Sequence, residues 1–281
     1  MPPRRTTLED YERRILRAQQ LLEARLDGPL SPAELARAAH FSLHHFHRIF
    51  RAQLGVTVMQ HVRRLRLERA ARHLRASDRR VLEVALDARY ESHEAFTRAF
   101  VDRFGVTPSD FRDQPSARLS AWTASREART PAVTVQACPA LRVAFLRHRG
   151  AYEGVEATWA RTVSWAAGRG LLPGAPLYGL CPDDPDVTPE EHLRFDCCVV
   201  LDEGPADPLG VCEIPGGTYA VAVHADPYQR LAETYLDLIG HWFPRSGYEP
   251  APDPIVEHYL NDPSTAAPDE LRTEVRVKIA E

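Results

Sequence analysis

The stretch FSLHHFHRIFRAQLGVT, residues 41–57, decides the fold of the first part of this chain, because a second copy of it follows. The second copy is YESHEAFTRAFVDRFGVT, residues 90–107. It keeps two phenylalanines, an arginine and the closing Gly-Val-Thr at an offset of fifty residues. It carries one extra residue before the first shared phenylalanine. An internal repeat of this kind predicts one supersecondary unit that is built twice.

Each copy, with the residues before it, predicts a short helix, a tight turn and a second helix. In the first copy Ser31 and Pro32 predict a helix start, with a capping hydroxyl and a proline at the first helical position. In the second helix Phe46 and Phe50 lie at helical spacing and predict a buried face. Gly55 predicts the end of this helix, because a left-handed residue often closes one.

The outward faces of the two second helices carry mostly hydrogen-bond donors and cations. Such a face suits base edges, because arginine pairs with guanine while threonine and histidine offer a smaller donor or acceptor. A helix-turn-helix places its second helix in the major groove of DNA. The repeated face therefore predicts a DNA-binding surface. Its residues are His44, His47, Arg48 and Arg51 in the first copy, and His93, Glu94, Thr97 and Arg98 in the second.

Two other interpretations of these residues are less favoured. The helical hairpins could pack together and leave the polar face merely solvated, but a pattern repeated with the same apolar and polar faces favours DNA binding. His44, His45 and His47 lie close in sequence, yet no cysteine or acidic residue lies beside them as a further zinc ligand. We therefore expect no metal site and no cofactor.

Residues 31–112 resemble the DNA-binding domain of AraC/XylS-type transcription regulators. The resemblance implies a seven-helix domain whose two recognition helices enter successive major-groove segments on one face of DNA. It implies base contacts for the outward residues above, except Arg51, which together with Thr107 is expected to contact phosphate. The glycine usual at the turn is His40 in the first copy and Arg89 in the second, which predicts backbone strain. The matching segments are LARAAHFSLHHFHRIF, RLRLERAARHL and VALDARYESHEAFTRAFVDRFGVTPSDFR.

The charge is divided along the chain, and this division predicts two domains. Residues 1–115 have a net charge of +6, residues 116–130 of +2 and residues 131–281 of −12, within a total of −4. Only the basic segment suits a polyanion. With 281 residues the chain is long enough for two cores. We expect a DNA-binding domain at 1–115, a linker at 116–130 in which Trp122 docks on one domain, and a second domain at 131–281.

Cysteine use and hydropathy predict a cytoplasmic protein with no membrane partner. All five cysteines lie after residue 131, and none forms a C-x-x-C pair. An odd number of cysteines without a secretory signal favours reduced thiols. No apolar run approaches the length of a membrane span. No phosphate-binding loop, dinucleotide fingerprint or nucleophile elbow occurs either.

Residues 131–281 predict an α+β domain. Eight short segments are rich in β-branched and aromatic residues and indicate strands. Two helices interrupt them, at about 153–168 and about 227–241. The strand segments are VTVQA, LRVAFLRH, LYGLC, FDCCVVL, GVCEI, TYAVAVH, IVEHYL and TEVRVKI.

A second, weaker repeat lies within this domain. His148 to Tyr152 precedes the first helix as His224 to Tyr228 precedes the second. The order of elements around them predicts two β-α-β-β units in tandem. Pro215–Gly217 predicts a tight turn between two strands. The fold class is therefore multidomain: an all-α double helix-turn-helix domain, followed by an α+β domain of two β-α-β-β pseudo-repeats.

Strand alternation places Glu257 in an unusual position. Ile255, Glu257 and Tyr259 share one face of a predicted strand. A buried carboxylate there is costly unless a cation or hydrogen-bond donors meet it. One solution is a ligand cation surrounded by aromatic rings. The alternative is that Glu257 faces water and the aromatic residues are ordinary core. The candidate wall residues are Tyr152, Trp159, Tyr178, Phe195 and Trp242.

The segments RHRGAYEGV, IPGGTYAVAVH, WFPRSGYEP and DPIVEHYLNDP resemble the GyrI-like effector-binding domain, a small-molecule receptor fused to some AraC-type regulators. The resemblance covers about residues 131–281. It implies a cleft between the two pseudo-repeats with Glu257 at its centre. We expect Tyr152, Trp242 and Tyr259 as further effector-binding residues. Family members often accept bulky, apolar, cationic compounds, and the acidic balance of this half agrees with that.

The sequence thus predicts a transcription regulator and not an enzyme. It would bind double-stranded DNA through its first domain and a small-molecule effector through its second, with RNA polymerase as a further partner. One alternative is a GyrI-like hydrolase of a small toxic compound fused to a DNA-binding domain, because Glu257 with a tyrosine can serve as acid or base. Another is a constitutive DNA-binding protein whose acidic domain meets only other proteins.

Overall fold

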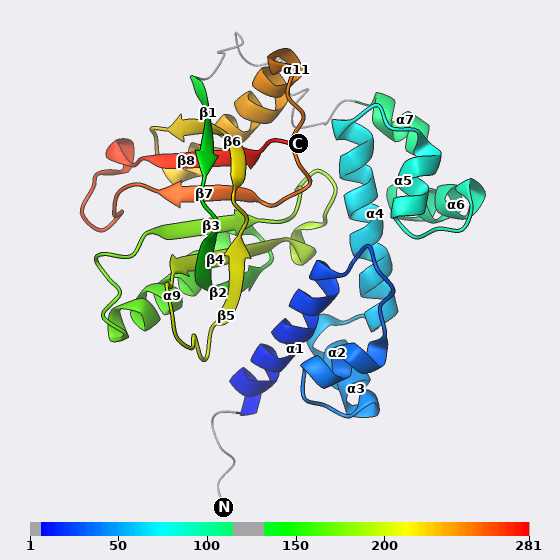
Figure 1. Ribbon diagram of the computed structural model, residues 1–281, viewed down its shortest axis with the longest axis horizontal. Helices are drawn as coiled ribbons and strands as arrows, with labels where there is room; N and C mark the ends of the chain where they lie inside the picture. The colour runs from blue at the N-terminus through cyan, green and yellow to red at the C-terminus, as the bar shows by residue number, and fades with distance from the viewer. Residues whose placement is uncertain (1–6, 115–131, 281) are drawn as a thin grey trace, which may run out of the picture. The chain divides into compact units, whose positions relative to one another are not determined.

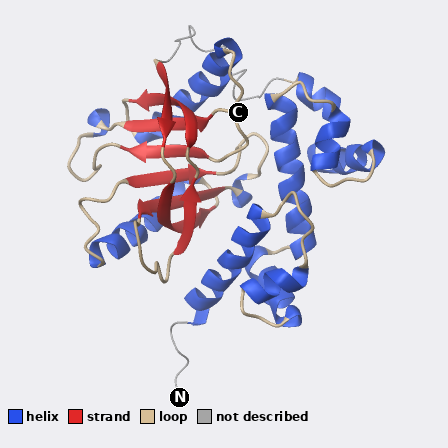
Figure 2. Cartoon of the chain, in the orientation of Figure 1, coloured by secondary structure: helices blue, strands red, loops and turns tan. Residues whose placement is uncertain are grey.

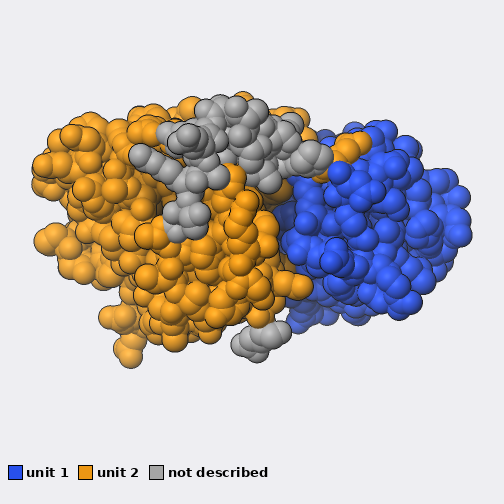
Figure 3. All heavy atoms as spheres, turned by 90° about the horizontal axis from the view of Figure 1, so that it is seen from above, with its two compact units in different colours: residues 1–113, 206–210 blue, residues 114–205, 211–281 orange. Residues whose placement is uncertain are grey.

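The computed structural model describes residues 7–114 and 132–280 (Figure 1). The chain forms two compact units, residues 1–113 with 206–210 and residues 114–205 with 211–281 (Figure 3). Helices build the first unit, and the strands belong to the second except for the first residue of one of them (Figure 2). The predicted fold class, an all-α domain followed by an α+β domain, is confirmed. The predicted linker and Trp122 lie outside the described residues.

Seven helices follow one another in residues 7–114, as the resemblance implied. Apolar side chains at helical spacing form the core between them, and Phe46, Phe50, Phe96 and Phe100 are fully buried. The repeat is thus visible in the core as well as in the sequence. The helices are α1 (Thr7–Ala24), α2 (Pro32–Ala38), α3 (Leu43–Leu54), α4 (Val58–Ala76), α5 (Val81–Asp87), α6 (His93–Phe104) and α7 (Pro108–Asp113).

Hydroxyl side chains determine where the second helix of each copy begins. Ser42 before α3 and Ser92 before α6 each accept a hydrogen bond from the amide three residues later. Ser31 stands at the same position before α2, but its side chain accepts no such bond. The predicted capping hydroxyl at Ser31 is therefore wrong. Pro32 accounts for that helix start, because its fixed φ suits the first turn and its missing N–H has no helical partner there.

Both helix-turn-helix turns hold a side chain in the left-handed conformation. His40 has a φ of 53° and Arg89 a φ of 64°. In each turn the next residue donates its amide to the carbonyl five residues earlier, at 2.9 and 3.0 Å, which closes the preceding helix. A residue with a Cβ atom in this conformation costs about 1–2 kcal/mol. The strain predicted at these two positions is confirmed.

The second unit is organised around one antiparallel sheet with the strand order β1-β6-β8-β7-β3-β4-β2-β5. All eight predicted strand segments are confirmed. Helix α9 packs on β2 and β4, and α10 packs on β6. The strands are β1 (Val133–Cys138), β2 (Leu141–Arg149), β3 (Leu177–Cys181), β4 (Arg194–Val200), β5 (Gly210–Ile214), β6 (Gly217–His224), β7 (Ile255–Tyr259) and β8 (Thr273–Lys278). The helices are α9 (Glu156–Gly168), α10 (Leu231–Leu236), the π-helical turn Asp237–Trp242 and α11 (Phe243–Ser246).

The two halves of this unit repeat the same local hydrogen bonds. The ring of His148 contacts the hydroxyl of Thr158 on α9 at 3.5 Å and a carbonyl three residues after the histidine at 2.8 Å. The ring of His224 contacts Thr234 on α10 at 2.8 Å and a carbonyl three residues later at 3.1 Å. Both pairs are related by an offset of 76 residues. The predicted tandem of β-α-β-β units is confirmed.

The segment Pro215–Gly217 does not form a hairpin turn. Strand β5 lies at one edge of the sheet beside β2, whereas β6 lies between β1 and β8 in the other half. A Cβ atom on Gly216 would lie 2.8 Å from the amide nitrogen of Ala140, so the bend before β6 crosses the bend before β2 at backbone contact. The predicted tight turn is wrong, because the two strands it joins pair in opposite halves of the sheet.

Candidate DNA-binding surface and ligand site

Helix α3 presents the predicted polar face to solvent. Its outward side chains are all exposed, while Phe46 and Phe50 on the other side are fully buried. The helix is therefore anchored by one face and open along the other, as a recognition helix must be. The exposed predicted residues are His44, His47, Arg48 and Arg51.

Helix α6 presents a similar face with one difference. His93, Glu94 and Arg98 are exposed, but Thr97 is half-buried and its hydroxyl oxygen is covered. Within the described residues that hydroxyl has no hydrogen-bond partner. Hydrogen bonds from its own backbone amide and from Ser92 hold the pKa of Glu94 below its usual range. The face of α6 is thus less uniformly cationic than that of α3.

Thr107, the other predicted phosphate contact, has a local role at the start of α7. Its hydroxyl donates to Asp110 Oδ2 at 2.7 Å and accepts from the Asp110 amide at 3.2 Å. Thr57, its counterpart in the first copy, accepts from the amide of Gln60 in the same way. Thr107 is exposed, so a phosphate contact stays a prediction, but its hydroxyl proton is already engaged.

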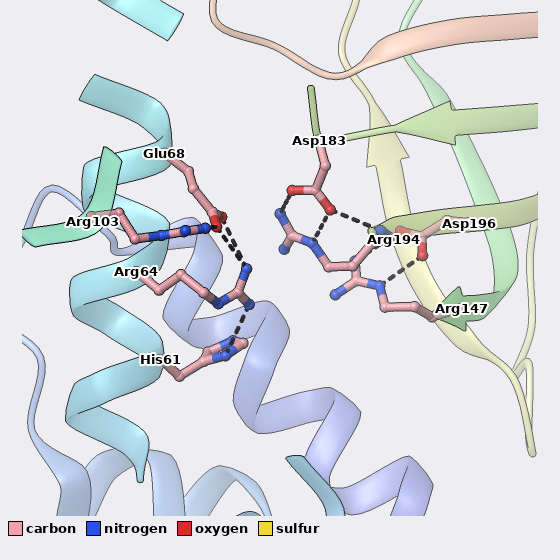
Figure 4. Close-up of polar contacts among 8 residues, drawn as sticks. All are labelled: His61, Arg64, Glu68, Arg103, Arg147, Asp183, Arg194 and Asp196. Atoms are coloured by element: carbon pink, nitrogen blue, oxygen red, sulfur yellow. Dashed lines mark hydrogen bonds and ion pairs between the residues drawn. The ribbon is translucent and has the colours of Figure 1, made fainter. Parts of the chain in front are cut away.

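A buried carboxylate ties the second recognition helix to α4 (Figure 4). Glu68 on α4 is only 3% exposed and accepts hydrogen bonds from Arg64 on the same helix, at 2.9 and 3.1 Å. It also accepts from Arg103 near the end of α6, at 2.9 Å. Arg64 contacts the ring of His61 at 3.3 Å. Sequence reasoning missed this cluster, although Glu68 is the single acid in an arginine-rich helix.

The second candidate site is built around Glu257 on β7. Glu257 is 5% exposed, and its carboxylate accepts hydrogen bonds from two tyrosines. Tyr235 on α10 donates to Oε1 at 2.5 Å, and Tyr259 donates to Oε2. The thiol of Cys181 on β3 lies 3.8 Å from Oε1. The carboxylate is therefore buried but surrounded by donors, which reduces the cost of its burial.

Aromatic rings from both pseudo-repeats stand around this carboxylate. The ring of Tyr259 meets Trp159 of α9 edge to face at 5.2 Å and Tyr228 at 5.6 Å. Phe195 on β4 meets Tyr152 at 6.0 Å and Trp159 at 6.4 Å. Edge-to-face arrangements of this kind are favourable for aromatic pairs. The site is thus one acidic group surrounded by aromatic rings that contact one another.

Gly179 makes room for the carboxylate. It pairs directly with Glu257 across the β3–β7 ladder, at the junction of the two pseudo-repeats. A Cβ atom on Gly179 would lie 2.4 Å from Phe195 Cζ and 3.1 Å from Glu257 Oε2. The two halves therefore differ where they meet, with no side chain from one and a carboxylate from the other. This asymmetry leaves space for a single acid.

Burial governs the protonation of the Glu257 cluster. Desolvation raises the pKa of Glu257, and the hydrogen bonds from Tyr235, Tyr259 and Cys181 oppose that rise. Burial raises the pKa of Tyr259 and Tyr235 well above the usual range, so both hydroxyls keep their protons. Burial also raises the pKa of the Cys181 thiol. The cluster offers a carboxyl group and neutral donors rather than a reactive thiolate.

The predicted wall residues have different positions. Tyr259 touches Glu257 directly, and Tyr152 belongs to the same cluster with a buried hydroxyl that has no partner within the described residues. Trp242 packs in a cluster that also contains Tyr235 and Ile255, with its ring stacked on Tyr248 at 6.0 Å and against Phe243 at 5.0 Å. Tyr235 in turn donates to Glu257, so an effector contact at Trp242 stays a prediction.

Sequence reasoning missed Tyr235, Cys181 and Gly179 at this site. A signal for Tyr235 was present, because it lies 76 residues after Trp159, the offset that relates the two halves. Tyr178, named as a possible wall, lies on the opposite face of the sheet, where it stacks on His258 at 4.5 Å.

Two buried ion pairs stiffen the strands around the site (Figure 4). Arg147 on β2 donates to both oxygens of Asp196 on β4, at 2.7 and 2.8 Å. Arg194 on β4 donates to both oxygens of Asp183, at 2.6 and 2.8 Å. Bidentate pairs of this kind restrict orientation as well as distance. They lie on the sheet face opposite Glu257, since their residues alternate with Phe195 and Cys197 along β4.

Metal and membrane features are not found in residues 7–114 and 132–280. No group of three histidine, cysteine or acidic side chains in these ranges is arranged to hold a metal ion. No helix there combines the length and the hydropathy that a membrane span needs.

Known families match both parts of the chain. Residues 131–280 match the GyrI-like small molecule binding domain. The chain belongs to this family. Residues 35–114 match a helix-turn-helix domain family. The GyrI-like match covers the Glu257 site, and the helix-turn-helix match covers both α3 and α6.

Three similar proteins illustrate these matches. YgiV of Escherichia coli (strain K12), a probable transcriptional regulator, is 35% identical over 147 residues, which are 50% of this chain and 92% of YgiV. The transcriptional regulator Rob of Salmonella typhimurium is 38% identical over 103 residues, which are 37% of this chain and 34% of Rob. The match to the cryo-EM structure of the EcmrR–DNA complex in EcmrR-RPo covers 89% of this chain and 99% of the EcmrR chain, with 14% identity and a TM-score of 0.47.

This GyrI-like chain is a DNA-binding transcription regulator of AraC type with an effector-binding domain. The predicted family and the predicted function of a DNA-binding regulator with an effector-binding domain are confirmed, whereas the chemistry of the effector stays a prediction. The curated relatives YgiV and Rob are both named as transcriptional regulators. The hydrolase alternative has no support from them.

Proposed function

We propose that the regulator reads DNA with the outward faces of α3 and α6. The exposure of these faces, opposite fully buried phenylalanines, supports the assignment. We divide the chain as a DNA-binding domain at 1–115, a linker at 116–130 and an effector-binding domain at 131–281. The proposed DNA contacts are His44, His47, Arg48, Arg51, His93, Glu94, Thr97, Arg98 and Thr107.

The proposed effector of the second domain is a small apolar cation. The observation that carries this is the buried Glu257, because a carboxylate among aromatic rings favours a ligand with positive charge and an apolar body. Tyr259 and Tyr152 are proposed contacts. Trp242 is proposed as a third contact, because it packs in one cluster with Tyr235, which donates to Glu257.

The effector would act by favouring one conformation of the regulator. A ligand shifts such an equilibrium only by its difference in affinity for the two states. We propose that the shift changes DNA affinity or contact with RNA polymerase, the enzyme on which a transcription regulator must finally act. A protein with these partners works in the cytoplasm.

The proposal is tested by selecting bound sequences from a random duplex library with the full chain. We expect one asymmetric motif with two boxes about one helical turn, roughly 34 Å, apart. The same selection with tetraphenylphosphonium present tests the effector, which should change the yield of bound DNA. A library without any enriched motif at moderate salt would refute the DNA-reading role, and an unchanged yield would refute the cation as effector.

Arg48→Ala is expected to cost about 1–3 kcal/mol of binding free energy on the selected operator and to relax specificity at one base pair. The reason is that an exposed arginine on the groove-facing side of α3 pairs with a base edge. Fluorescence anisotropy on the operator and on random duplex measures both effects. Equal weakening on the two DNAs would show that Arg48 contacts only the backbone.

Binding of tetraphenylphosphonium is expected to strengthen as the pH rises through the pKa of Glu257. Burial raises this pKa above the value of about 4.3 that is usual for glutamate. The folded protein therefore holds the proton on Glu257 more tightly than the unfolded chain does. The stability that this protonation contributes is lost as the pH rises through the folded pKa. The cation favours the ionised form, so its affinity should rise by up to about tenfold per pH unit below that pKa and then level off. Calorimetric titrations across the range measure this, and a flat profile would contradict it.

A further inference from the structure

A groove of about 540 Å³ lies in the first unit between α4 and the second helix-turn-helix. Helix α4 contacts both α5 and α6 there (Figure 1). The groove has an apolar part, with Val62 and Met59 from α4 and Ala95 and Ala99 from α6. The remaining lining residues are Arg63, Arg66, Ala88, Arg89, Tyr90, Arg98 and Asp102.

The charge of this groove is strongly unbalanced, with four arginines and one aspartate. Arg63 lies 3.8 Å from Asp102, and both side chains are largely exposed. Arg66 donates to two backbone carbonyls between α1 and α2, at 3.0 and 3.1 Å. Within residues 7–114, the guanidinium groups of Arg89 and Arg98 make no hydrogen bond or ion pair, although the backbone amide of Arg89 donates to Leu86 and Arg98 lies near the charge of Glu94. Two cations in the groove are thus available to an anion.

The lowered pKa of Arg66 also indicates an excess of positive charge in the groove. Burial lowers the pKa of Arg66, and the positive charges of Arg89 and Arg69 lower it further. Nearby guanidinium groups therefore repel one another without a carboxylate to balance them fully. A bound anion would relieve this repulsion.

Arg89 reaches the groove from a strained position. It is the turn residue with a φ of 64°, a conformation that glycine adopts without steric cost. His40 has the same conformation in the first copy but does not line the groove. A side chain kept at a strained position often has a function. At Arg89 the side chain adds a cation beside Arg98, which lies both in the groove and on the outward face of α6.

We propose that this groove holds a phosphate group of the DNA backbone next to the second recognition helix, with Arg89 as its main ligand. A guanidinium group presents donors in a planar fork that matches phosphate, and the apolar part of the groove suits a deoxyribose. Such a contact positions α6 on the duplex but carries no sequence information. The inference rests on the proposed DNA-reading function.

The test compares Arg89→Gly with His40→Gly in the full chain. Both substitutions relieve the same turn strain, so each should raise the melting temperature by about 2–4 °C. Only Arg89→Gly should weaken DNA binding, by about 3- to 10-fold on operator and random duplex alike. It should also reduce the slope of log affinity against log salt by about 0.9, the value for one lost phosphate contact. His40→Gly should leave affinity and slope unchanged.

Three results would overturn the inference while leaving the DNA-reading function intact. One is wild-type affinity and salt slope in Arg89→Gly. Another is a loss confined to one base pair of the operator, which would make Arg89 a base contact. The third is stabilisation of the wild type but not of Arg89→Gly by inorganic phosphate at constant ionic strength, combined with unchanged DNA affinity in Arg89→Gly, because the groove would then be a site for the free ion only. Absence of operator binding by the wild type would refute the proposed function itself.

Discussion

Glu257→Gln abolishes most of the affinity for an aromatic cation such as tetraphenylphosphonium, with an expected loss of about 2–5 kcal/mol of binding free energy. The side chain keeps its size and an oxygen that accepts from Tyr235, so the aromatic surround stays in place. What disappears is the negative charge opposite a cation that has left water. Isothermal titration calorimetry on the full chain measures the change in Kd.

Glu274→Gln is the matched control for this substitution. Glu274 lies on β8, where it accepts a hydrogen bond from Arg276 Nε at 2.9 Å on the sheet face opposite Glu257. The substitution removes one charge from the same domain and leaves the aromatic rings around Glu257 unchanged, so the cation should bind with unchanged Kd. If both variants weakened binding equally, long-range charge and not a specific carboxylate would account for the affinity. An unchanged Kd in Glu257→Gln would refute the assigned site.

Glu68→Ala is expected to destabilise the first unit by about 2–4 kcal/mol. Removing one partner of a buried ion pair has a cost of this order. The substitution leaves Arg64 and Arg103 facing each other without their shared carboxylate. Arg103 is 25% exposed, which lets water reduce part of the cost. Because Arg103 belongs to α6, the loss also frees the second recognition helix from α4. Chemical unfolding followed by circular dichroism measures the stability change.

Asp87→Ala in the same unit provides the control. Asp87 and Arg79 form an ion pair of 2.6 Å, with side chains 51% and 40% exposed. Exposed pairs of this kind contribute less than about 1 kcal/mol, so this variant should unfold almost as the wild type does. Similar losses in the two variants would show that burial of Glu68 has no special importance. In library selection, Glu68→Ala should weaken the sequence preference in the operator box read by α6 more than in the box read by α3, because Glu68 binds Arg103 of α6.

Local pattern was sufficient for most of the architecture. The spacing of Phe46 and Phe50 predicted the buried face of α3, and alternation along β7 put Glu257 and Tyr259 on one side of the strand. The basic and acidic halves indicated two domains with separate tasks. These features follow from periodicities of 3.6 and 2 residues, which any single segment displays without its neighbours.

Predictions failed where the answer depended on which surfaces meet. Pro215–Gly217 has the composition of a hairpin turn, yet its two strands pair in opposite halves of the sheet. Here residue type was a correct guide to local preference and gave no information on which strands pair.

The sequence by itself determined the repeat, the faces of its helices, the strands and the family of this regulator, because these depend on neighbours along the chain. Only the tertiary structure decided the surroundings of Glu257. Tyr235 lies 22 residues away in sequence and Cys181 lies 76 away, and the missing side chain of Gly179 matters only because β3 pairs with β7. The link between Glu68 and Arg103 likewise spans 35 residues. Periodicity tells which side of an element is apolar, whereas packing of distant segments decides which sides come together and which charges they enclose.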